Sequence, residues 1–157
     1  MRLFTGLELS QGVRGAIERA MGRTMVNLHI TIKFIGEWPE ARLGELLATL
    51  QSLPRRGLIH IELRGTVAKR RLLWASVDAG PELAALARET NDALAPLGIA
   101  REEKPYLPHV TLSRAGGPSL TDDDFGAFDA GEFHLYHSQP GASGSVYTKL
   151  ATFSIAA

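Results

Sequence analysis

The chain contains no cysteine, and this absence removes several kinds of chemistry. Without a thiol there is no disulfide, no thiolate nucleophile and no cysteine-ligated zinc site. An excess of one charge is also missing, because 17 Lys and Arg are balanced by 17 Asp and Glu. A chain without a net positive field is not drawn as a whole onto polyanions. Any contact with nucleic acid is therefore expected to be local, in a pocket for an end or a short segment.

Long apolar runs are absent too, and nothing resembles a signal peptide. We therefore expect a cytoplasmic protein that does not contact a membrane. No glycine-rich loop followed by Lys and Ser or Thr is present, which argues against a nucleotide-hydrolysing motor. The glycine segment PGASGS at 140–145 predicts a turn. With 45% hydrophobic residues, the chain is expected to fold as one domain over residues 1–157, by default a monomer without an obligate protein partner.

The pattern of hydrophobic residues alternates between strand and helix along the chain. Strands are expected at 2–9, 27–37, 58–67, 71–79, around His109, at 131–138 and at 145–155. Helices are expected at about 11–21 with Ser10 as N-cap, at about 39–52, and from Pro81 to a stop at Pro96 and Gly98. The acidic run DDD at 122–124, after Thr121, indicates the solvated start of a further helix.

One of these strands carries an unusual set of polar side chains. In NLHITIKFIGE, residues 27–37, every second residue up to Phe34 is apolar, which predicts a strand with that side against the core. The other side presents His29, Thr31 and Lys33 in a row. A single His-x-Thr of this kind is ordinarily exposed polar surface.

The same arrangement occurs a second time. PHVTLSR, residues 108–114, places His109, Thr111 and Ser113 on one side of a strand. The second histidine follows the first by 80 residues, about half of the 157-residue chain. This spacing suggests an internal duplication, in which two similar lobes each contribute one strand to a shared cleft.

Two imidazoles that face one another across a cleft are suited to general acid–base catalysis. The reference pKa of imidazole is about 6.5, so one ring can be neutral and the other protonated near neutral pH. One then takes a proton from a nucleophile and the other donates one to a leaving group. Hydroxyl groups two residues further on can donate to anionic oxygens, and the ammonium of Lys33 adds charge. A phosphodiester is the natural substrate for such a set.

Other interpretations of the histidines are less favoured. Two histidines eighty residues apart, without a carboxylate in either strand, make a poor metal-binding set, so no metal is expected. His60, His134 and His137 lie in strand-like segments without a repeated pattern, and we interpret them as surface or packing residues. Phe34, Trp74 or Tyr147 could stack on a base, but packing is the expected role of all three, and Phe34 has the parity of a core residue.

The sequence resembles a known family, the two-histidine phosphoesterases, and in particular the bacterial and archaeal RNA 2′,3′-cyclic phosphodiesterases, also called RNA 2′–5′ ligases. NLHITIKFIGE and PYLPHVTLSR resemble its two signatures, while RLFTGLEL, RLLWASVD, FHLYHS and VYTKLATF are similar to its other strands. The resemblance implies an α+β fold with two pseudo-symmetric lobes. Antiparallel sheets of the two lobes would line a V-shaped central cleft, and the helices would pack on the outside.

The resemblance also implies an activity, the hydrolysis of a terminal RNA 2′,3′-cyclic phosphate to a 2′-phosphate, without a metal or another cofactor. The expected binding partners are such RNA ends or small cyclic nucleotides. His29 matches the family's general acid and His109 its general base, although the two copies are nearly equivalent and the sequence alone does not fix this order. Thr31 and Thr111 match the residues that contact the phosphate.

Lys33 and Arg114 are further candidates for phosphate binding. Arg114 matches a basic residue that closes the second signature, but strict alternation turns it away from His109 unless the strand twists or ends there. Two other functions stay open at this point. The same site could run in reverse and join a cyclic phosphate to a 5′-hydroxyl through a 2′–5′ linkage, or the chain could bind RNA ends or nucleotides without catalysis.

Overall fold

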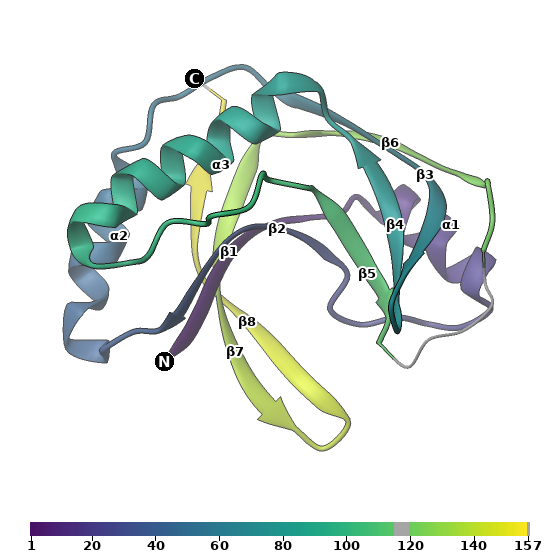
Figure 1. Cartoon of the computed structure of the whole chain (residues 1–157), viewed down its shortest axis with the longest axis horizontal. Coiled ribbons are helices and arrows are strands. Elements are labelled where there is room, and N and C mark those ends of the chain that lie inside the picture. The colour runs from purple at the N-terminus through teal and green to yellow at the C-terminus, as the bar shows by residue number, and fades with distance from the viewer. Residues whose placement is uncertain (115–119, 157) are drawn as a thin grey trace.

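The computed structural model describes residues 1–114 and 120–156, which form two antiparallel sheets and the helices between their strands (Figure 1). The strands are β1 (Arg2–Glu8), β2 (His29–Glu37), β3 (Ile59–Lys69), β4 (Leu72–Asp78), β5 (His109–Ser113), β6 (Asp124–Ala130), β7 (Glu132–Gly141) and β8 (Gly144–Ser154). The α-helices are α1 (Gln11–Met21), α2 (Leu43–Gln51) and α3 (Gly80–Leu94), and the short 3-10 helices are η1 (Glu40–Arg42) and η2 (Ala95–Leu97). Within the described ranges, no helix is both long and apolar enough to cross a membrane.

The two sheets have matching topologies. One has the strand order β2-β1-β7-β8 and the other β5-β4-β3-β6, and all pairs are antiparallel. In each sheet a strand–helix–strand unit, β1-α1-β2 or β4-α3-β5, provides the edge strand that carries a histidine. These two edge strands contact each other. The expected α+β fold with two pseudo-symmetric lobes is confirmed.

Helices α1 and α3 connect the lobes, because each packs against the other lobe's sheet. Helix α1 follows β1 of the first sheet but packs against β6 of the second. Helix α3 follows β4 of the second sheet and packs against β2 of the first, with α2 beside it (Figure 1). The predicted N-cap of α1 is confirmed, since the Ser10 hydroxyl accepts a hydrogen bond from the Val13 amide at 3.2 Å.

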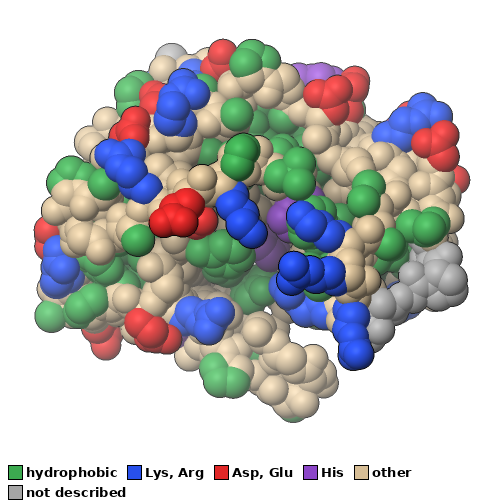
Figure 2. Space-filling model, in the orientation of Figure 1, with side chains coloured by type: hydrophobic (Ala, Val, Ile, Leu, Met, Phe, Trp, Pro, Cys, Tyr) green, Lys and Arg blue, Asp and Glu red, His purple; other side chains and the backbone are tan. Residues whose placement is uncertain are grey.

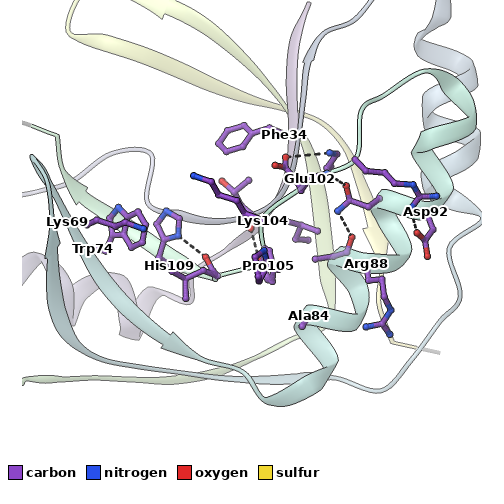
Figure 3. Close-up of a pocket in the computed structure, with 18 residues that line it drawn as sticks. Phe34, Lys69, Trp74, Ala84, Arg88, Asp92, Glu102, Lys104, Pro105 and His109 are labelled. Atoms are coloured by element: carbon purple, nitrogen blue, oxygen red, sulfur yellow. Dashed lines mark hydrogen bonds and ion pairs between the residues drawn. The ribbon is translucent and has the colours of Figure 1, made fainter.

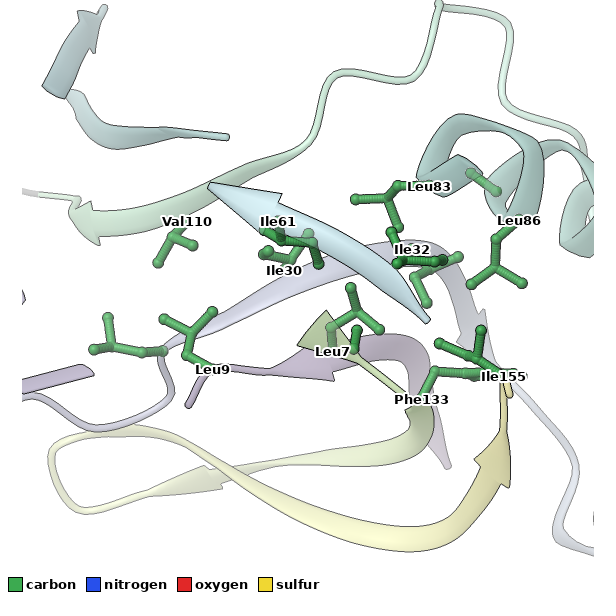
Figure 4. Close-up of a cluster of buried hydrophobic side chains, with 14 of the residues drawn as sticks. Leu7, Leu9, Ile30, Ile32, Ile61, Leu83, Leu86, Val110, Phe133 and Ile155 are labelled. Carbon is green, nitrogen blue, oxygen red and sulfur yellow. The ribbon is translucent and has the colours of Figure 1, made fainter. Parts of the chain in front are cut away.

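A single hydrophobic core joins the two lobes (Figure 4). It includes Ile30 from β2, Ile61 from β3 and Val110 from β5, each 0% exposed. The expected parity of both signature strands is therefore confirmed at these positions. Because side chains alternate along a strand, the histidines next to Ile30 and Val110 are turned to the side away from the core.

A β-bulge changes the parity further along β2. Adjacent residues of β1 pair with Thr31 and Lys33, so Ile32 is an extra residue without a partner. Beyond this point the two sides of the strand exchange. The expectation that Phe34 faces the core is wrong, since its side chain is 61% exposed, whereas Lys33 is only 2% exposed.

The acidic run at 122–124 does not begin a helix, so that prediction is wrong. Asp124 begins the strand β6, which pairs with β3. The Thr121 hydroxyl accepts a hydrogen bond from the Asp123 amide at 3.1 Å, so it stabilises a turn instead of capping a helix. The strand was missed because its pairing with β3 is a long-range contact. The predicted turn at 140–145 is confirmed as the connection of the β7–β8 hairpin.

Candidate active site

His29, the first residue of β2, is held through both ring nitrogens. Its Nδ1 lies 2.7 Å from the backbone carbonyl oxygen of Asn27, and its Nε2 lies 2.9 Å from the hydroxyl oxygen of Thr31. Aromatic rings surround the imidazole, with the ring of Phe4 at 4.9 Å and the ring of Tyr147 edge-on at 5.2 Å between centroids. The ring is therefore fixed in orientation and largely removed from water.

This environment changes how readily His29 binds a proton. Burial lowers the pKa of His29, because the charged imidazolium loses its hydration. The hydrogen bond with the Asn27 carbonyl acts in the opposite direction, while the positive charges of Arg114 and His109 lower the pKa further. The two strands that carry the signatures, β2 and β5, contact each other.

His109, the first residue of β5, is held in a different way. Its Nδ1 lies 2.9 Å from the Leu107 carbonyl oxygen. Its ring stacks on the Trp74 indole of the neighbouring strand β4, with 3.7 Å between centroids and 17° between planes (Figure 3). The Lys69 ammonium lies 5.3 Å from the centroid of the Trp74 ring. Trp74 thus packs as expected, but against the histidine, where it supports the imidazole.

The other candidate residues occupy distinct positions. Thr31 lies beside His29, and Thr111 pairs with Trp74 across β4 and β5. Arg114 follows Ser113, the last residue of β5, so strict alternation along the strand no longer fixes the side to which its side chain turns. The condition under which this arginine could join the site is therefore met.

Lys33 is placed differently from the sequence-based expectation. After the bulge its side chain is buried, and its ammonium donates to the Ala100 carbonyl at 2.6 Å and lies 3.4 Å from a carboxylate oxygen of Glu102. These bonds attach β2 to the segment that precedes β5. The ammonium is thus already engaged by protein oxygens.

A cavity of about 740 Å³ opens between the lobes next to these residues (Figure 3). His109, Thr31, Trp74 and the exposed Phe34 are among its lining residues, and His29 lies outside the lining. The charged residues that line it are Lys33, Lys69, Arg88, Arg101, Lys104, Asp92 and Glu102. Positive side chains therefore predominate here although the whole chain is neutral, and Figure 2 shows Lys and Arg gathered around a hollow in which histidine is visible.

The comparisons with known proteins point in one direction. A profile of the 2′-5′ RNA ligase superfamily matches residues 11–133, most of the chain. The chain belongs to this superfamily. The RNA 2′,3′-cyclic phosphodiesterase of Methanocaldococcus jannaschii is 29% identical over 94% of this chain and 96% of its own length. That of Aeropyrum pernix is 33% identical over 79% of this chain and 80% of its own. The crystal structure of TT0787 from Thermus thermophilus matches with a TM-score of 0.84 and 30% identity, over 99% of this chain and 98% of that one.

Membership of the 2′-5′ RNA ligase superfamily confirms the resemblance noted from the two signatures. The sequence analysis did not, however, identify Tyr106 as a residue of the candidate site. Its hydroxyl donates to the Thr31 carbonyl oxygen at 2.7 Å, and burial raises its pKa, so it stays a neutral donor. No local pattern signals such a contact, because 75 residues separate the partners.

Two of the remaining histidines, His60 and His134, lie outside the lining of the cavity. His60 is exposed between Asp129 and Glu62, and these carboxylates raise its pKa. His134 is buried, and its Nδ1 lies 2.8 Å from the Thr152 hydroxyl oxygen. The interpretation of these two as surface and packing residues agrees with the structure. In the residues that the structure describes, no three His, Asp or Glu side chains cluster in a way that could hold a metal ion.

Proposed function

We propose that this protein hydrolyses the 2′,3′-cyclic phosphate at the end of an RNA to a 2′-phosphate, with His29 and His109 as the proton-transferring pair. One observation carries the proposal: each histidine begins an edge strand, its Nδ1 is held by the carbonyl two residues earlier, and the two strands meet beside a basic cavity. The activity is the one named for the relatives from Methanocaldococcus jannaschii and Aeropyrum pernix.

In this reaction water attacks the phosphorus while the bond from phosphorus to O3′ breaks. His109 takes the proton of the water, and His29 donates a proton to O3′ as it leaves. Burial lowers the pKa of His29 in the free protein, but the negative charge of a bound cyclic phosphate favours the imidazolium and so supports the role of acid. The proton lost by water and the proton gained by O3′ balance, so the pair is left in exchanged protonation states that solvent restores.

The charge on the non-bridging oxygens needs donors. Thr31 and Thr111 are suited to this role because both are partly exposed on the histidine-bearing sides of their strands. Arg114 is proposed as an additional cation near the first histidine. Lys33, bonded to the Ala100 carbonyl, is proposed to hold the cavity wall, and its geometry gives no support to direct phosphate binding.

The cavity also bears on the class of substrate. Its exposed aromatic wall, Phe34, offers a face on which a base can stack, and its basic rim suits phosphates. Both features favour a nucleotide or RNA end over a small inorganic ester. We propose RNA ends as the substrate, a monomeric protein and a cytoplasmic location.

The superfamily name points to a second reaction at the same site. If a 5′-hydroxyl replaces water as the nucleophile, the same pair of histidines would form a 2′–5′ linkage, because the hydroxyl attacks the same phosphorus, loses its proton to the same base, and O3′ leaves with a proton from the same acid. Water at its high concentration favours hydrolysis.

The experiment incubates the protein and EDTA with a labelled oligonucleotide that ends in a 2′,3′-cyclic phosphate. Opening of the ring to a 2′-phosphate is the expected result, and addition of a 5′-hydroxyl oligonucleotide reports ligation. Binding without opening would show a non-catalytic RNA-end module. Opening only after a divalent metal is added would contradict the scheme of two histidines acting without a metal.

A further inference from the structure

Asn27, two residues before His29, has an unusual backbone. Its φ of 64° lies in the left-handed region, which residues other than glycine seldom occupy. In the described part of the chain, Arg70, with φ of 57°, is the one other non-glycine residue in this region. Asparagine tolerates the conformation better than most residues, because its short polar side chain can form local hydrogen bonds. The conformation still carries a cost that some gain must offset.

The backbone of Asn27 acts directly on His29. Its carbonyl oxygen lies 2.7 Å from Nδ1, and a carbonyl can only accept a hydrogen bond, so Nδ1 must carry the proton. In the neutral ring this fixes Nε2 as the atom without a proton, and Nε2 is the nitrogen that lies 2.9 Å from the Thr31 hydroxyl oxygen. One backbone conformation thus determines both the tautomer and the orientation of the ring.

The side chain of Asn27 makes a second connection. Its Nδ2 donates to the Ser145 carbonyl oxygen at 2.6 Å, across 118 residues of sequence. Ser145 lies near the tip of the β7–β8 hairpin, which projects from the body of the protein (Figure 1). Two residues further along this strand, Tyr147 sets its ring edge-on to His29. The side-chain amide of Asn27 therefore attaches the β7–β8 hairpin next to the place where Tyr147 of that hairpin contacts the His29 ring.

His109 obtains the equivalent bond by other means. Its Nδ1 also lies close to the carbonyl two residues earlier, that of Leu107, at 2.9 Å. Leu107 precedes Pro108, and a residue before proline is restricted to extended conformations. The two lobes thus share a carbonyl at position i−2 but reach it through a left-handed Asn in one lobe and a residue before proline in the other. Such convergence is expected where the bond itself matters.

We propose that Asn27 is a positioning residue for His29: its left-handed backbone presents the carbonyl that holds the Nδ1 proton and so leaves Nε2 as the nitrogen that gains and loses the catalytic proton. The kinetic part rests on the proposed hydrolysis, whereas the tautomer can be measured without it. Asn27 itself does not contact the reacting atoms in this account.

The test compares Asn27→Gly, Asn27→Val and the matched control Arg70→Val. Glycine keeps the left-handed backbone and loses only the bond to Ser145, so its kcat should stay within about threefold of the wild-type value. Valine disfavours φ above zero at either position. In Asn27→Val the change of backbone should displace the carbonyl that holds His29, whereas Arg70→Val changes a backbone that does not contact His29. We therefore expect kcat to fall about 10–100-fold, with KM little changed, in Asn27→Val alone. Because the Asn27 hydrogen bond raises the pKa of His29, the limb of the pH–rate profile that His29 contributes should move to lower pH in Asn27→Val alone.

Nitrogen-15 NMR of the His29 ring gives an independent measurement. The wild type and Asn27→Gly should show the Nδ1–H tautomer, and Asn27→Val a mixture. If Asn27→Val does not fold, Asn27→Ala, which is less hindered, replaces it. The inference is overturned if the folded variant keeps the wild-type tautomer, or if its kcat and pH profile match those of Arg70→Val. A wild-type protein that opens no cyclic phosphate would refute the proposed function, and the tautomer result would still decide the role of Asn27.

Discussion

Replacing Lys33 with Met separates a structural lysine from one that binds phosphate. Methionine keeps most of the buried aliphatic stem, so the main loss is the bond from the ammonium to the Ala100 carbonyl. The pair with Glu102 adds little, because it is 3.4 Å long and its carboxylate side chain is 52% exposed. A hydrogen bond to a charged group contributes about 1.5–3 kcal/mol, but the Ala100 carbonyl lies near solvent and can bind water instead.

We therefore expect Lys33→Met to lower the free energy of unfolding by about 1–2 kcal/mol. For a chain of this size, that loss lowers the melting temperature by roughly 2–8 °C. Since the ammonium is held by protein oxygens, kcat for cyclic-phosphate opening should stay within about threefold of the wild-type value.

Thermal melts and steady-state kinetics measure both effects. Lys69→Met is the control, because Lys69 is an exposed cation that lines the same cavity and has no such buried bond, so its melting temperature should barely change. An unchanged melting temperature together with a fall of about 30-fold or more in kcat/KM for Lys33→Met would refute the structural role. That outcome would restore the phosphate-binding role suggested by the sequence.

Three further predictions concern the core, the pH dependence of stability and the cavity wall. Val110→Asp should prevent folding, because it places a carboxylate at a position that is 0% exposed in the shared core, and circular dichroism would detect the loss. Burial lowers the pKa of His29 and of His134, so at these two residues the unfolded chain binds protons more readily than the folded one below pH about 6.5. The stability that these two rings contribute should therefore fall as the pH falls through this range, whereas His60, whose pKa is raised, acts in the opposite direction. The loss of stability between pH 7 and pH 5.5, read as a change in melting temperature, should be smaller for His29→Ala than for the wild type. Phe34→Ala should weaken the binding of an RNA-end substrate by about 1–3 kcal/mol, seen mainly as a higher KM, while Phe34→Tyr should retain the affinity. Equal KM values for Phe34→Ala and Phe34→Tyr would contradict stacking of a base on this ring.

Local sequence patterns were sufficient for those parts of the site that depend on alternation within a single strand. The apolar period at Ile30 and Val110 placed both residues in the core and therefore placed both histidines on the other side. The spacing of 80 residues between the two histidines indicated two similar lobes. Both inferences need only the order and spacing of residues in the sequence.

Features that depend on partner strands could not be predicted. The bulge at Ile32 arises from the pairing of β1 with β2, and it reverses the expected sides of Lys33 and Phe34. The strand β6 exists because β3 provides a hydrogen-bonding edge for it. Likewise, the stacking of Trp74 on His109 requires β4 and β5 to be neighbours. In each case a long-range contact decided the local structure.

The central claim is that His29 and His109 transfer protons in one transition state. The most direct measurement compares turnover of a cyclic-phosphate-ended RNA, in EDTA, by the wild type, His29→Ala, His109→Ala and the double variant. Each single change should slow turnover by roughly 10²–10⁴-fold, and the double variant should lose far less than the product of the two losses, because the residues act as a unit. Full activity in either folded single variant would contradict the account.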